Sequence, residues 1–133
     1  VAAGATGRAL LAEFGLRIGS YVIEIGGALA AIRAEASLDE LLALAEASDV
    51  RCPDPAAAEA MRQRINEARA AGDSLGGVFW VVAQGAPPGL GSHVQWDRRL
   101  DAALAAAVMS IPAIKGVEIG LGSDPCQEEV RAV

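Results

Sequence analysis

Hydrophobic residues recur along the chain with two different periods, and together these periods predict a mixture of helices and strands. Residues 2–14 place Leu10, Leu11 and Phe14 at helical spacing, and a glycine follows them. Residues 20–25, SYVIEI, alternate between polar and β-branched apolar side chains and are followed by two glycines, which is typical of a strand. The first two predicted elements are therefore a helix and a strand.

Two further helices are predicted from the residues at which they would begin. Ser37 and Glu40 form a capping-box pattern before an apolar run that is expected to end near Ala47. Asp54 can cap the free amides of the next helix, because the proline that follows it suits the first helical position. Gly72 is expected to end this helix. Its inward-facing side chains are predicted to be Met61, Ile65 and Ala68.

The second half of the chain is predicted to contain two strands and one helix. Residues 75–84, LGGVFWVVAQ, form an apolar run typical of a mostly buried strand, and residues 113–121 are predicted to form the final strand. Residues 97–109 lie between them and are rich in alanine and leucine, which favours a helix. One stripe of this helix would carry Leu100, Leu104 and Val108.

The order of these elements predicts one α+β domain across residues 1–133, with helices packed on a sheet in layers. Hydrophobic residues make up 53% of the chain and aromatic residues only 4%, so the core is expected to consist mainly of aliphatic side chains. Trp80 lies within an apolar run and is predicted to be part of the core. Trp96 precedes a helix and is predicted to be a hydrophobic staple or a subunit contact.

The net charge limits the classes of molecule that the chain is expected to bind. The chain carries 17 acidic and 11 basic residues, for a formal net charge of −6. Nucleic-acid-binding proteins usually present a basic surface, so that class is disfavoured. No apolar run approaches the roughly 18 residues that a membrane-spanning helix needs, so membrane association is disfavoured as well.

The two cysteines, Cys52 and Cys126, lie far apart and form no CxxC pattern. Only one histidine is present to join them, so a tetrahedral zinc site is not expected and no metal is predicted. Isolated cysteines and the lack of a recognisable signal peptide favour reduced thiols in the cytoplasm.

The single histidine, His93, is a candidate general acid or base because its free pKa lies near neutrality. No carboxylate is fixed beside it by the sequence, so a hydrogen bond to the following helix is the favoured interpretation. Asp97 and Asp101 would share a helix face, and paired carboxylates can exchange protons. Their position near a helix start, where negative charge is stabilised, gives a sufficient explanation without catalysis.

Two glycine-rich stretches, GDSLGG and PPGLGS, invite comparison with phosphate-binding loops. Neither fits the P-loop pattern, and neither follows a strand and opens a helix in the dinucleotide-binding order. Gly76 and Gly77 are instead expected to form a turn or bulge with positive φ. Gly89 and Gly91 are expected to reverse the chain between a strand and a helix.

A long run of motifs nevertheless resembles one enzyme family. Residues 72–120 contain GDSLGG, PPGLG, DRRLDA and VMSIPAIKGVEIG in the order in which chorismate synthases carry similar motifs. Residues 1–5, VAAGA, and residues 51–55, RCPDP, also resemble segments of that family. Residues 123–133, SDPCQEEVRAV, resemble a late family motif that a long segment normally separates from the EIG strand. The sequence therefore indicates a junction of two family segments near residues 122–123.

The resemblance implies a function. Chorismate synthases remove phosphate and a ring hydrogen from 5-enolpyruvylshikimate 3-phosphate by 1,4-anti elimination, with reduced FMN as cofactor, in the shikimate pathway of aromatic amino-acid biosynthesis. The family resemblance also implies a β-α-β sandwich fold, a homotetramer and a phosphorylated small-molecule substrate.

Asp124 matches the aspartate of the late motif and is the one catalytic residue that the resemblance transfers to this chain. The family's early histidine motif and its serine-arginine motif are not found, and cofactor-binding residues are not identified. The chain is therefore expected to lack an independent flavin site and to be inactive when isolated. The alternatives are a non-catalytic core fragment that forms oligomers, and a small unrelated α+β binding module.

Overall fold

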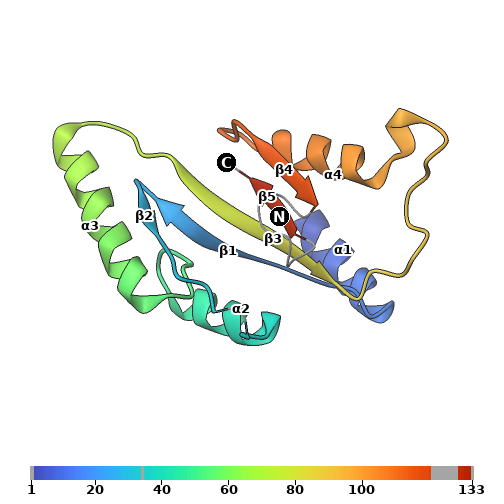
Figure 1. Cartoon of the computed structure of the whole chain (residues 1–133), viewed down its shortest axis with the longest axis horizontal. Coiled ribbons are helices and arrows are strands. Elements are labelled where there is room, and N and C mark those ends of the chain that lie inside the picture. The colour runs from blue at the N-terminus through green and yellow to red at the C-terminus, as the bar shows by residue number, and fades with distance from the viewer. Residues whose placement is uncertain (1, 34, 121–128, 133) are drawn as a thin grey trace.

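The computed structural model describes residues 2–33, 35–120 and 129–132, in which helices pack against an antiparallel sheet (Figure 1). The predicted α+β class, with helices packed on a sheet, is confirmed by this arrangement. In chain order the elements are α1 (Ala2–Glu13), β1 (Arg17–Ile25), β2 (Ala28–Leu29), α2 (Leu38–Ala47), α3 (Pro55–Ala71), β3 (Gly77–Gln84), the 3₁₀ turn η1 (Trp96–Arg98), α4 (Leu100–Met109), β4 (Val117–Gly120) and β5 (Glu129–Ala132).

The sheet has the strand order β2-β1-β3-β5-β4, and all of its pairings are antiparallel. The pairing of β1 with β3 runs from Arg17 opposite Gln84 to Ile25 opposite Gly77. A register shift between Val22 and Glu24 interrupts it. Strand β1 begins at Arg17, three residues before the predicted start, and β3 begins at Gly77, two residues after its predicted start. Strands β2 and β5 were not predicted. The short strands are defined by their partners rather than by their own sequence.

Gly77 lies beside the register shift, and it is required there for a reason that the sequence did not predict. A Cβ on this residue would approach the carbonyl oxygen of Glu24 to 2.7 Å, so only glycine allows the two backbones to come this close. The expectation of positive φ at Gly76 and Gly77 is wrong, since neither is among the residues with positive φ. The constraint at this position is therefore the close approach of the two backbones, not the backbone dihedral.

Helix α2 covers the central strands with its apolar face. Leu41 and Ala45 are buried against Tyr21, Ile23 and Val78 of β1 and β3. Ser37 caps the helix by accepting a hydrogen bond from the Glu40 amide at 3.2 Å, as predicted. The reciprocal half of the capping box is not formed, because the Glu40 carboxylate pairs with Arg33 instead.

Helix α3 builds a second cluster at the β2 edge of the sheet. Met61 has no exposed surface and packs in one cluster with Ala30, Cys52, Ala57 and Ala58. The predicted cap residues are confirmed: Asp54 accepts hydrogen bonds at the start, and Gly72 ends the helix in the left-handed conformation. Of the predicted inward-facing residues, Met61 is buried, whereas Ile65 and Ala68 are only half-buried.

The segment before α4 differs from its predicted form. Residues 97–109 do not form one helix, because Arg99 is extended with ψ of 136° and separates η1 from α4. The amide of Ser92 donates to the carbonyl of Arg98 at 2.9 Å, which turns the chain back at this point. Asp97 and Asp101 therefore do not share a helix face. The predicted strand over 113–121 is shorter as well, since β4 begins only at Val117.

Met61→Ala is expected to lower the free energy of unfolding by about 2–5 kcal/mol, because it removes a fully buried side chain and leaves a cavity. Met109→Ala makes the same chemical change on α4, where the side chain is 46% exposed, and is expected to cost less than about 1 kcal/mol. Urea unfolding followed by circular dichroism measures both. Equal losses for the two variants would contradict the core assignment.

Candidate functional site

A cavity lies between the PPGLGSH loop, the start of α4 and strand β4. Its volume is about 660 Å³. Four large apolar side chains line it: Leu90, Leu100, Leu104 and Ile119. Its polar lining comes from Ser92, His93, Arg99 and Asp101. We call this hollow the α4 cavity.

The loop that forms one wall of the α4 cavity depends on two glycines. Gly89 and Gly91 have φ of 92° and 78°, so the prediction that they reverse the chain is confirmed. A Cβ on Gly91 would lie 2.9 Å from both the Cβ and the amide nitrogen of Leu100. The loop can therefore pack directly on the first turn of α4 only with glycine at this position. Val94 adds a local turn by donating its amide to the Ser92 hydroxyl at 3.2 Å.

The charged groups of the α4 cavity neutralise each other. Arg99 forms an ion pair with Asp101, and its Nε lies 3.0 Å from the Asp101 Oδ1. The hydrogen bond from Arg99, with a further one from the Ala102 amide, lowers the pKa of Asp101. The same contact raises the pKa of Arg99. Asp101 is thus held as a carboxylate and is poorly suited to act as a general base.

The helix contact expected of His93 and the staple expected of Trp96 are not formed, whereas a subunit contact of Trp96 stays a prediction. His93 is exposed and makes no hydrogen bond within the described part of the chain, and α4 has no side-chain cap. The expected bond from His93 to the helix is therefore not formed. Trp96 is 78% exposed, so it does not act as a hydrophobic staple. Trp80, by contrast, packs against Tyr21 with the ring centroids 5.8 Å apart, in agreement with the prediction of a core position.

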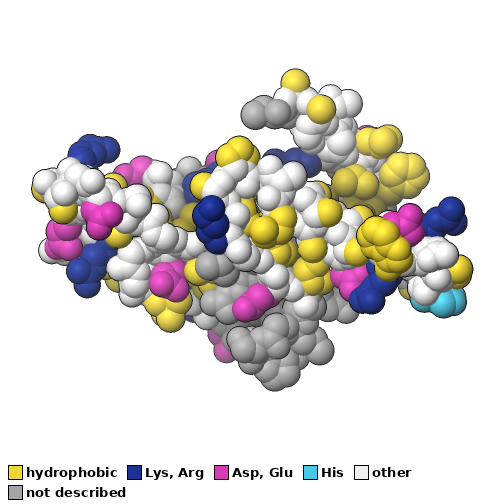
Figure 2. All heavy atoms as spheres, turned by 90° about the horizontal axis from the view of Figure 1, so that it is seen from above, with side chains coloured by type: hydrophobic (Ala, Val, Ile, Leu, Met, Phe, Trp, Pro, Cys, Tyr) yellow, Lys and Arg dark blue, Asp and Glu magenta, His cyan; other side chains and the backbone are white. Residues whose placement is uncertain are grey.

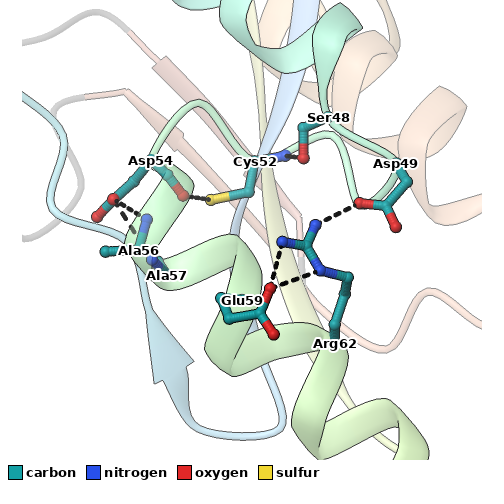
Figure 3. A network of polar contacts seen from close by, with 8 residues as sticks. All are labelled: Ser48, Asp49, Cys52, Asp54, Ala56, Ala57, Glu59 and Arg62. Carbon is teal, nitrogen blue, oxygen red and sulfur yellow. Dashed lines mark hydrogen bonds and ion pairs between the residues drawn. The ribbon is translucent and has the colours of Figure 1, made fainter.

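A second polar cluster surrounds Cys52 at the start of α3 (Figure 3). The Cys52 amide donates to the Ser48 hydroxyl at 3.3 Å, and the thiol donates to the Asp54 carbonyl at 3.5 Å. Burial raises the pKa of the Cys52 thiol, which therefore stays protonated and unreactive at neutral pH. The nearby Arg62 is held between two carboxylates, with nitrogen–oxygen distances of 2.7 Å to Asp49 and 2.6 Å to Glu59. This cluster is structural rather than catalytic.

Asp54 joins two parts of the chain within that cluster. Its carboxylate accepts hydrogen bonds from the amides of Ala56 and Ala57 at 2.9 and 3.4 Å, and from the Ala31 amide at 3.0 Å. The Ala31 bond is the largest cause of the lowered pKa of Asp54. The residue thus caps α3 and also fixes the segment that follows β2.

The comparisons with known proteins agree with this fold and with the motifs that build the loop. The family model described as chorismate synthase matches residues 1–132. The chain belongs to the chorismate synthase family. A crystal structure of a chorismate synthase superposes with a TM-score of 0.79 at 48% sequence identity, covering 91% of this chain and 38% of that chain.

Chorismate synthases from several bacteria show the same relationship. The enzyme of Symbiobacterium thermophilum is 58% identical over 122 residues, which are 92% of this chain and 31% of the relative. The enzyme of Brevibacillus brevis is 57% identical over an equal span, and that of Listeria innocua is 46% identical over 128 residues. The chain thus spans about a third of the length of these relatives.

The described residues do not fit a site for FMN or for a phosphorylated substrate. Binding of several phosphate and carboxylate groups requires unpaired cations that converge, because charge-assisted hydrogen bonds supply most of the affinity. Carboxylates already pair six of the described arginines: Arg17, Arg33, Arg51, Arg62, Arg64 and Arg99. The arginine of the α4 cavity is one of them.

Two predicted residues, Asp124 and Cys126, lie outside the described residues, so their surroundings are not specified. The structure brings His93 close to Arg99 and Asp101 around the α4 cavity, but it does not bring Asp97 there. The pairing of Arg99 with Asp101 was not predicted. Its signal was present in the sequence as two opposite charges next to the start of an apolar helix.

No helix in the described part of the chain has both the length and the apolar character needed to cross a membrane.

Asp54→Asn is expected to reduce the pH dependence of stability between about pH 5 and pH 3. The folded-state pKa of Asp54 is lowered, so its contribution is present above the unfolded-state pKa of about 3.9 and is lost as the pH falls through the folded value. Asparagine keeps a capping oxygen but does not titrate, and the variant should lose less stability on acidification than the wild-type chain.

Urea unfolding at several pH values measures this difference. Glu13→Gln is the control, because Glu13 is exposed and makes no ion pair or hydrogen bond with any residue that the structure describes. An acid dependence of the Asp54→Asn variant as steep as that of the wild type would contradict the role of the Asp54 carboxylate.

Proposed function

We propose that this chain takes part in the chorismate synthase reaction. In this reaction 5-enolpyruvylshikimate 3-phosphate loses phosphate and a ring hydrogen by 1,4-anti elimination to give chorismate, a step of the shikimate pathway. The observation that carries the proposal is the family match over residues 1–132, together with the superposition on a solved chorismate synthase. The proposal includes reduced FMN as cofactor, assembly as a homotetramer and a cytoplasmic location.

The chain contributes scaffold rather than the anion-binding groups of the reaction. Its sheet, its α2 and α3 clusters and its PPGLGSH loop are formed within the described residues. Its arginines are largely paired with carboxylates, and the formal net charge is −6. The cations that hold flavin and substrate would therefore come from sequence that the longer relatives carry beyond the matched segment.

Asp124 is the residue of this chain that we propose for the active site. The support is its position in the SDPC motif, which resembles the late motif of the family. A carboxylate in an active site can orient a substrate or stabilise developing charge. This role does not require a contact with the arginines described above.

The isolated chain is expected to bind no FMN. Titration of FMN with the purified chain should leave flavin absorbance and fluorescence unchanged, because the described residues lack a cluster of free cations. The S. thermophilum relative serves as the positive control at the same concentrations. Saturable binding by the isolated chain, with a spectral response to the substrate, would show that a flavin site exists here after all.

Asp124→Asn is expected to lower kcat by about 10²-fold, the usual cost of losing one electrostatic group in an active site. Activity is measured after this chain is co-expressed with the S. thermophilum relative from which the aligned segment has been deleted. Asp39→Asn is the control, since Asp39 is an exposed partner of Arg17. Unchanged kcat in the Asp124 variant would remove Asp124 from the active site and leave the family assignment intact.

A further inference from the structure

We draw no further inference here: the strongest candidate, the cavity of about 310 Å³ that Arg8 and Arg51 line between α1, the β1–β3 pair and α2, is bounded by a helix that buries none of its residues, and nothing in the structure shows what covers the hydrophobic side chains that remain at the surface (Figure 2).

Discussion

The antiparallel pairing of β1 with β3 is the contact on which the rest of the fold depends. It joins strands that two helices separate in sequence, and it places Tyr21 directly opposite Trp80. The α2 cluster packs on both strands of this pair, and the α3 cluster packs on β1 and on β2 beside it. The two helices therefore depend on packing against these strands for most of their stability.

Local signals predicted helices well, and long-range contacts explain where the predictions were incomplete. The caps at Ser37 and Asp54 set the starts of α2 and α3, because each satisfies free amides within one turn. The four residues of β5 form a strand only through their pairing with β3 and β4, so no pattern in the segment itself revealed it. The start of α4 was misplaced because the loop folds back on Leu100, a contact that spacing does not encode.

The candidate site was predicted only in part, for a physical reason. The family motifs singled out the glycine-rich loop and His93 in the sequence. In the structure these residues line a cavity together with Arg99 and Asp101. Which side of α4 faces the sheet was not predictable, because a helix of alanine and leucine has no polar face to fix its rotation. Motifs of the scaffold therefore identified the family, whereas the binding of anions depends on free cations that converge in space.

The two edges of the sheet differ in how completely they are covered. Met61 is fully buried at the β2 edge and Ala45 is fully buried over the β1–β3 pair, and the helices that carry them are capped. At the β4 edge, α4 buries none of its residues and keeps its leucines toward an open cavity. We infer that most of the stability of the described fold arises over the β1–β3 pair and at the β2 edge, because burial of apolar surface is its main source.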